Sequence, residues 1–146
     1  MLYGGDLRKD GYTELFSDMS LQYKDYQGNV DRDTFFFQNY FSWPIHLNFN
    51  TETKLKYLNC RVKPVFVDCP EEYQGDKNKP IAPINNENKY IYAKSLLKMR
   101  KEMESESDAR VILGGRTYGF SGFLPGIIEE FTQAVIERHP VYLLGG

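Results

Sequence analysis

A glycine-rich segment near the end of the chain has the residue types and spacing of an anion-binding turn. Val111 to Leu113 is a short apolar run typical of a strand, and glycines follow it directly. Glycines let backbone N–H groups approach a phosphate closely, and the N-terminus of a following helix favours negative charge. An arginine can bind a phosphate through two hydrogen bonds. The pattern predicts ligand contacts from Gly114, Gly115, Arg116, Thr117, Gly119 and Gly126.

Two acidic residues follow these glycines. Pro125 suits the first turn of a helix that runs to about Arg138, which places Glu129 and Glu130 near its start. The helix dipole alone favours carboxylates there, by about 0.3–1 kcal/mol. A carboxylate beside a phosphate loop can also stabilise a cationic sugar centre or bind ribose hydroxyls. The residues alone leave both interpretations open, and the glycines themselves could simply turn the chain.

A second glycine turn lies at the start of the chain. Leu2-Tyr3 resembles the end of a strand, and Gly4-Gly5 follows it. Asp6 could cap this turn or bind a ribose, and Arg8 comes shortly after. Arg100 lies on a predicted helix, where a charged side chain with a packed stem is the plain interpretation. We retain as candidate ligand contacts Gly4, Gly5, Asp6, Arg8, Arg100 and Glu130.

The histidines and cysteines lack metal-ligand spacing. His46 and His139 have no histidine partner at helical spacing, and we expect structural or surface roles for them. Cys60 and Cys69 flank a predicted strand, which would hold them roughly 30 Å apart, too far for a disulfide. We therefore expect reduced thiols, a cytoplasmic location, no metal and no cofactor.

Predicted strands and helices alternate along the chain. The predicted strands cover residues 2–3, 45–49, 61–69, 110–113 and 141–144. The predicted helices cover residues 12–23, 33–43, 51–58, 89–105 and 125–138. In the first helix, one face is expected to be buried, that of Tyr12, Leu15, Phe16, Met19 and Tyr23. Residues 70–88 are expected to form a long loop with few core contacts. The alternation predicts one α/β domain, a Rossmann-like parallel sheet with helices on both faces, in which strand 110–113 is central and fully buried.

Composition and charge exclude several classes of protein. Of the 146 residues, 41% are hydrophobic and 15% aromatic, which excludes a disordered chain. The net charge of −2 argues against a nucleic-acid binder. No apolar run approaches the ~20 residues that span a bilayer, so we expect no membrane partner. The first strand is very short and the chain ends on Gly145-Gly146, so we expect residues 1–146 to be a domain excised from a longer protein.

Several segments resemble, in order, the LOG branch of the SLOG (Smf/DprA–LOG) superfamily. These segments are Leu2-Tyr3-Gly4-Gly5, Met99-Arg100-Lys101 with Met103, Asp108-Ala109 before Gly114-Gly115, Gly126-x-x-Glu129-Glu130, and Pro140 to Leu144. The resemblance implies a Rossmann-like fold, a homo-oligomer, and hydrolysis of the N-glycosidic bond of nucleoside 5′-monophosphates. The family's arginine falls on Arg100 and its glutamate on Glu130, which the resemblance makes catalytic if this chain is an enzyme.

Two departures from the LOG pattern point to a different branch. Ile127 stands where LOG enzymes have a threonine, and residues 116–125 lengthen the loop. The longer loop resembles SLOG domains fused to TIR, Sir2 or other effectors in bacterial defence proteins. This resemblance implies sensing of an NAD- or ADP-ribose-related messenger that regulates an attached effector. We therefore expect a nucleotide-ligand-binding module, with an N-glycosidase as the alternative and a structural domain with vestigial glycine loops as a third.

Overall fold

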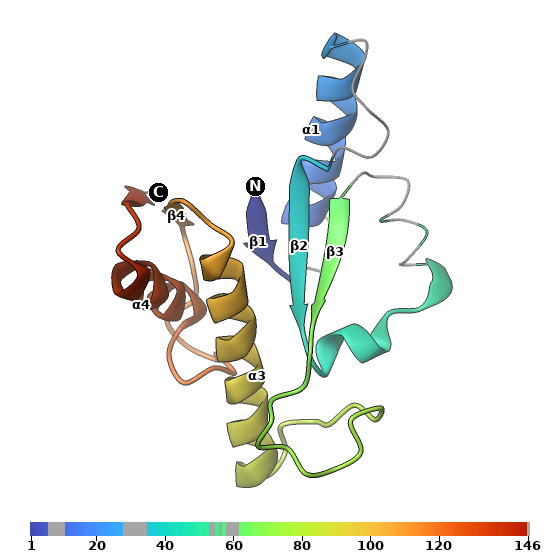
Figure 1. Ribbon diagram of the computed structural model, residues 1–146, viewed down its shortest axis with the longest axis vertical. Coiled ribbons are helices and arrows are strands. Elements are labelled where there is room, and N and C mark those ends of the chain that lie inside the picture. The colour runs from blue at the N-terminus through green and yellow to red at the C-terminus, as the bar shows by residue number, and fades with distance from the viewer. Residues whose placement is uncertain (6–10, 28–34, 53–54, 56, 58–61, 146) are drawn as a thin grey trace.

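The computed structural model describes residues 1–5, 11–27, 35–52, 55, 57 and 62–145, with only the backbone for residues 24–27. Strands and helices alternate, and the strands pair in parallel (Figure 1). The elements are β1 (Leu2–Gly4), α1 (Tyr12–Gln27), β2 (Phe37–Ser42), the 3-10 helix η1 (Ile45–Asn48), β3 (Val62–Val67), α3 (Asn86–Ser105), β4 (Arg110–Leu113), α4 (Gly126–Glu137) and β5 (Val141–Leu144). The prediction of a single α/β domain with a Rossmann-like fold is confirmed.

Helices cover both faces of the three-stranded sheet β1-β2-β3. Because side chains alternate along a strand, β2 contributes to two separate clusters. Phe37 and Phe41 pack on the face where Phe16 of α1 lies. Tyr40 packs on the other face, against Met99 and Met103 of α3. β2 is therefore the central strand, and α1 and α3 lie on opposite faces of it.

β4 and β5 form a separate two-stranded parallel sheet. The prediction that strand 110–113 is central and fully buried is wrong. Arg110 is buried, but Val111 and Leu113 are 57% and 52% exposed. An apolar run fits a strand covered on both faces, yet it does not show whether the second face has a cover. Among the described residues, β4 pairs with β5 alone.

The aromatic segment before Pro44 is a strand, although the spacing of its phenylalanines and tyrosines predicted a helix. β2 pairs with β1 on one side and β3 on the other, with Phe37 opposite Val62. Aromatic side chains suit a strand that is covered on both faces, and this packing overrides the helical spacing. The strand predicted over 45–49 is likewise wrong, because residues Ile45–Asn48 form η1.

α1 buries a different face from the one predicted. Its buried residues are Thr13, Ser17 and Ser20, with Phe16 partly buried. The other residues expected to be buried are 43–53% exposed, namely Tyr12, Leu15, Met19 and Tyr23. Asn39, at the centre of β2, explains the choice, because its Nδ2 donates a hydrogen bond of 3.1 Å to Thr13 Oγ1. A buried amide needs a polar partner, so the hydroxyl face of the helix turns inward.

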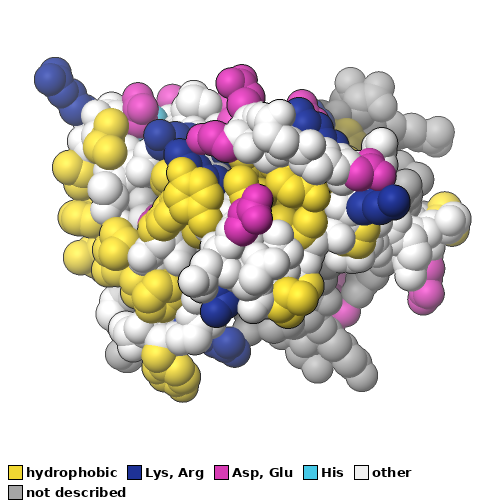
Figure 2. Space-filling model, turned by 90° about the horizontal axis from the view of Figure 1, so that it is seen from below, with side chains coloured by type: hydrophobic (Ala, Val, Ile, Leu, Met, Phe, Trp, Pro, Cys, Tyr) yellow, Lys and Arg dark blue, Asp and Glu magenta, His cyan; other side chains and the backbone are white. Residues whose placement is uncertain are grey.

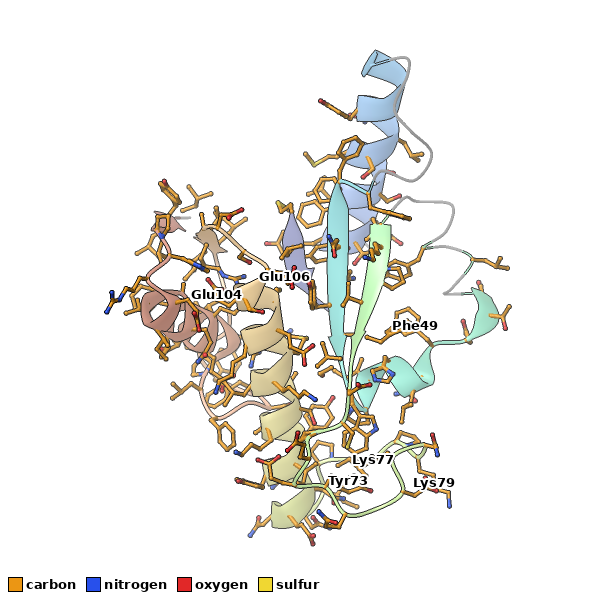
Figure 3. The ribbon with its side chains drawn as sticks, in the orientation of Figure 1. Phe49, Tyr73, Lys77, Lys79, Glu104 and Glu106 are labelled. Carbon is orange, nitrogen blue, oxygen red and sulfur yellow. The ribbon has the colours of Figure 1, made fainter. Side chains whose placement is uncertain are left out.

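The segment between β3 and α3 contacts the core at a few points. It contains no regular element before Asn86, as predicted, but Tyr73 packs on Trp43 with ring centroids 4.7 Å apart. Trp43 Nε1 also donates a hydrogen bond of 2.8 Å to the carbonyl oxygen of Lys77. Figure 3 labels Tyr73 and Lys77 in this segment. Most residues of the segment are exposed, in keeping with few core contacts, and Trp43 holds it at these two points.

Many large apolar side chains of α4 and β5 are exposed. They are Ile128, Phe131, Val135 and Ile136 of α4, and Tyr142, Leu143 and Leu144 of β5. Figure 2 shows hydrophobic side chains gathered on the side where α4 lies in Figure 1. Within the described part of the chain, no helix combines the length and hydrophobicity needed to cross a membrane.

Candidate functional site

A cavity of about 200 Å³ lies where β1 and β2 end. Gly4 and Gly5 line it from the end of β1, and Ser42 from the end of β2. Arg100 of α3 and Glu130 of α4 add charged groups. The remaining lining is apolar and consists of Phe41, Ile45, Leu96 and Met99. Open α/β sheets bind ligands beyond the carboxyl ends of their strands, so this cavity is the candidate site.

The two glycines after β1 allow close packing at the cavity. A Cβ atom on Gly5 would lie 2.7 Å from Phe41 Cδ1 and 3.1 Å from the carbonyl oxygen of Tyr40. The Gly5 N–H donates a hydrogen bond of 2.7 Å to that same oxygen. At Gly4, a Cβ atom would lie 3.9 Å from Glu130 Oε1. The glycines therefore bring the end of β1 against β2 and against the carboxylate of α4.

Arg100 is held by carboxylates and by glycines. Its guanidinium pairs with Glu129, and its Nε lies 3.7 Å from Glu130 Oε1. A Cβ atom on Gly126 would lie 2.8 Å from Arg100 Nη2, and one on Gly122 would lie 3.2 Å from Nη1. The glycines at the start of α4 thus pack around a guanidinium of the protein itself.

The ion pairs continue away from the cavity toward the end of α3. Arg110 Nη1 lies 3.4 Å from Glu130 Oε2, and Arg110 Nε donates a hydrogen bond of 2.9 Å to Glu104 Oε2. Glu104 is fully buried, and its Oε1 lies 2.8 Å from His139 Nδ1. Figure 3 shows Glu104 near the end of α3, on the side toward α4. Glu130 therefore bridges two arginines, one at the cavity and one at the start of β4.

Burial raises the pKa of Glu130, although Arg110 and Arg100 act to lower it. A carboxyl group with a raised pKa holds its proton closer to neutral pH, so it can donate a proton to a bound group. In its ionised form it can accept hydrogen bonds or stabilise a positive charge. Both forms are chemically useful at the wall of a cavity.

Two polar atoms of the cavity residues have no hydrogen-bond partner within the described part of the chain. They are Ser42 Oγ and Arg100 Nε. Both residues are buried, at 1% and 9% exposure. A buried polar group without a partner costs about 1–3 kcal/mol and is rare in folded proteins. A ligand that offers partners to these atoms would recover that free energy.

The structure brings together some of the predicted site residues and leaves others apart. Gly4, Gly5, Arg100 and Glu130 line the cavity, and Gly126 packs on Arg100. Asp6 and Arg8 lie outside the described residues. The remaining predicted contacts are exposed in the loop after β4 and do not line the cavity, namely Gly114, Gly115, Arg116, Thr117 and Gly119.

The glycines after β4 have structural roles in their own loop. Gly114 and Gly119 have φ angles of 61° and 63°, a backbone region that favours glycine where a chain turns. A Cβ atom on Gly115 would lie 2.6 Å from Ile127 Cδ1. Gly115 thus lets the loop pack on the first turn of α4.

Sequence reasoning missed Ser42 and the partners of the arginines. The helix predicted over residues 33–43 includes Ser42, and its place at the end of β2 instead brings it to the candidate cavity. Glu129 pairs with Arg100, and its Oε1 accepts a hydrogen bond of 2.8 Å from the Leu124 N–H. No sequence pattern indicates that Arg110 pairs with Glu104, because the folded structure brings the start of β4 against the end of α3.

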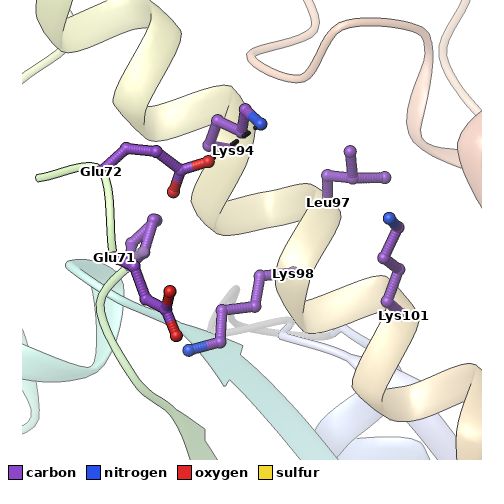
Figure 4. A pocket seen from close by; sticks show the side chains of 7 residues that line it. Glu71, Glu72, Lys94, Leu97, Lys98 and Lys101 are labelled. Carbon is purple, nitrogen blue, oxygen red and sulfur yellow. Dashed lines mark ion pairs between the residues drawn. The ribbon is translucent and has the colours of Figure 1, made fainter.

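A larger open groove of about 540 Å³ lies beside α3, where the chain leaves β3 (Figure 4). Lys94, Lys98 and Lys101 line it from α3, opposite Glu71 and Glu72. The Lys94–Glu72 ion pair measures 3.0 Å, and Lys98 Nζ donates to the carbonyl oxygen of Cys69 at 3.4 Å. Its charges are solvated or paired with one another, so the smaller cavity is the better candidate site.

The described histidine and cysteine residues take structural positions. His46 Nε2 lies 3.2 Å from the carbonyl oxygen of Val67, and burial lowers the pKa of His46. Cys69 is a buried free thiol, and Cys60 lies outside the described residues. Among the described residues, no group of three or more His, Cys, Asp or Glu side chains is arranged to hold a metal ion.

Comparison with known proteins gives a family. The family model described as SLOG cluster2 matches residues 1–146. No curated protein and no solved structure gives a match. The matched range contains the cavity, both glycine turns and the Arg100–Glu130 pair, in agreement with the predicted resemblance to the SLOG superfamily. The chain belongs to the SLOG cluster2 family.

Proposed function

We propose that this domain is a sensor that binds a nucleotide-derived small molecule, of the NAD or ADP-ribose type, without cleaving it. The observation that carries the proposal is the cavity where β1 and β2 end, with Arg100, Glu130 and the unpartnered hydroxyl of Ser42. A polar, enclosed site at the carboxyl ends of parallel strands is typical of nucleotide binding in Rossmann-like folds. In this proposal, the phosphates of the ligand bind near the loop after β4.

The loop after β4 is suited to such a contact. Arg116 and Thr117 are exposed, and the loop leads into the N-terminus of α4. A charge-assisted hydrogen bond contributes about 1.5–3 kcal/mol, so Arg116→Ala is expected to weaken binding by roughly 10- to 150-fold. Isothermal titration calorimetry with ADP-ribose measures the change. Unchanged affinity would exclude Arg116 as a phosphate contact.

A thermal-shift screen tests the binding proposal. The panel contains NAD, ADP-ribose, cyclic isomers of ADP-ribose and nucleoside monophosphates. A ligand at 100 times its Kd stabilises a one-site protein by about 2.7 kcal/mol, which raises Tm by roughly 5–10 °C in a chain of this size. If none of these compounds raises Tm, the proposal is wrong and the interpretation as a structural domain takes its place.

A LOG-like N-glycosidase is the second candidate, and Glu130 is the observation that favours it. This carboxyl group lines the cavity and has a raised pKa. Incubation with nucleoside 5′-monophosphates, followed by chromatography of released base, separates an enzyme from a sensor. In an enzyme, Glu130→Gln would abolish turnover and spare binding, because the charge acts on the cationic transition state. In a sensor, wild type releases no base and Glu130→Gln changes affinity only a few-fold. Ile127, packed under Gly115 where LOG enzymes have a threonine, favours the sensor.

We further propose that the domain forms a homo-oligomer and regulates an effector on the same polypeptide, as in the bacterial anti-phage defence proteins that it resembles. The exposed apolar side chains of α4 and β5 support this, because large apolar patches mark interaction surfaces. Phe131 and Leu143 are 40% and 70% exposed. Sedimentation of wild type against Leu143→Glu tests self-association. A monomeric wild type at all concentrations would contradict it.

A further inference from the structure

We infer that the cavity between the ends of β1 and β2 binds an uncharged pentose ring of the ligand, and that Ser42 recognises the hydroxyl groups of this ring. The phosphates of the ligand lie outside the cavity. The inference rests on the proposed function, and it names the part of the ligand that this cavity takes. It gives Ser42 the role of a specificity-determining residue.

The charges around the cavity disfavour a phosphate inside it. Within the described residues, three carboxylates of Glu104, Glu129 and Glu130 are linked to two guanidiniums of Arg100 and Arg110, with His139 beside Glu104. Arg100 is already shared between Glu129 and Glu130. A phosphate would have to take Arg100 from these carboxylates and leave Glu129 buried without its ionic partner, which is strongly unfavourable. An uncharged group leaves the ion pairs intact.

The unpartnered atoms fit a hydroxyl-bearing group better than an anion. Ser42 Oγ can both donate and accept a hydrogen bond, and Arg100 Nε can only donate. The ionised carboxylate of Glu130 only accepts. A sugar hydroxyl can accept from Arg100 or Ser42 and donate to Glu130 at the same time. The oxygens of an ionised phosphate only accept, so they would meet the ionised carboxylate of Glu130 with no proton between them.

The volume of the cavity and the residues that line it limit which part of the ligand can enter. Its volume of about 200 Å³ is below the ~300–1,000 Å³ typical of sites that enclose a whole ligand. It corresponds to about seven water molecules at ~30 Å³ each, which is room for a single sugar ring and less than a nucleoside. Leu96, Met99 and Ile45 form an apolar wall against which the carbon face of a ring can pack.

The test uses ribose 5-phosphate, 2-deoxyribose 5-phosphate and inorganic phosphate, each titrated into the 146-residue chain and followed by NMR. Wild type is expected to bind ribose 5-phosphate about 3- to 10-fold more tightly than its 2-deoxy analogue, the effect of one neutral hydrogen bond. Ser42→Ala is expected to lose a similar factor for ribose 5-phosphate and to bind the two sugars alike. The loss of discrimination is the signature, since a general structural effect would weaken both sugars equally.

Ser105→Ala is the matched control, because Ser105 lies at the exposed end of α3 and its hydroxyl donates a hydrogen bond of 2.8 Å to the carbonyl oxygen of Glu102 in its own helix. It should keep the wild-type preference. Ser42→Ala removes a hydroxyl without a partner, so the variant is expected to fold.

If nucleotides bind but both sugars bind equally, or ribose 5-phosphate does not bind, the inference is wrong and the proposed function stands. The same holds if inorganic phosphate displaces ribose 5-phosphate from the cavity residues. If no nucleotide binds, both are wrong.

Discussion

The two glycine turns, Gly4-Gly5 after β1 and Gly114-Gly115 after β4, look alike in sequence but lie in different surroundings. The first turn closes a cavity against the side chains of Phe41 and Met99. The second leads into an exposed loop, and Gly114 has open space around it. Both follow a parallel strand, where a ligand is expected, yet only the first is enclosed.

This difference shows that enclosure matters as much as residue type. The loop after β4 offers the more obvious phosphate-binding residues, Arg116 and Thr117, and they face solvent. The turn after β1 offers no charged side chain in its described residues, yet α3 and α4 bring Arg100 and Glu130 to it. An enclosed site strengthens each polar contact, because water no longer competes for it.

The strongest test of the comparison replaces one arginine in each region. Arg100→Ala is expected to lower the free energy of unfolding by about 3–5 kcal/mol, because it leaves Glu129 buried without its partner. Arg116→Ala should change it by less than about 0.5 kcal/mol, since that side chain is exposed. Urea denaturation measures both. Equal effects would show that the two regions do not differ in enclosure.

Replacing one glycine in each turn should give a smaller difference. Gly5→Ala is expected to destabilise by about 1–3 kcal/mol, because the new Cβ atom meets Phe41 and the backbone oxygen of Tyr40. Gly114→Ala should cost about 1 kcal/mol, since only its φ of 61° is unfavourable there. Gly145→Ala is the control, with nothing within 4 Å of the added atom. The Tm values from thermal unfolding are expected to be lowest for Gly5→Ala, higher for Gly114→Ala and highest for Gly145→Ala. A larger loss at Gly114 than at Gly5 would contradict the close packing at β1.

The smallest expected effect concerns the pH dependence of stability at Glu130. Because the pKa of Glu130 is raised in the folded state, its contribution is fully present below the ordinary glutamate pKa and is lost as pH rises through the raised value. Glu130→Gln removes this loss, and Arg100 and Arg110 keep Glu129 and Glu104 as partners. The variant should gain stability relative to wild type between about pH 4 and neutral pH, by less than about 1 kcal/mol.

The control for this measurement is Glu106→Gln, at the exposed end of α3. Its unfolding curves should follow those of wild type at each pH. A stability difference between Glu130→Gln and wild type that stays constant with pH, or shrinks as pH rises, would show that burial does not raise the pKa of Glu130.

Elements whose local signals agree with their surroundings could be predicted from the amino-acid pattern. The strand near residues 62–67, the helix α3 and the helix after Pro125 followed from β-branched content, helical spacing and proline position. The LOG-like order of motifs also predicted Arg100 and Glu130 as site residues, and the structure places both at one cavity. These features depend on neighbours in the chain, so a single sequence contains them.

Tertiary structure alone decided which faces are buried and which charges meet. Spacing could not show that residues 37–42 form the central strand, because pairing with β1 and β3 overrides a helical pattern. It could not turn the Thr13 face of α1 inward, because the reason is the amide of Asn39. Nor could it link Arg110 to Glu104 and Glu130, or leave the Ser42 hydroxyl without a partner at the cavity. Each of these outcomes depends on the burial of polar groups between different helices and strands, and the cost of that desolvation arises only once the chain has folded.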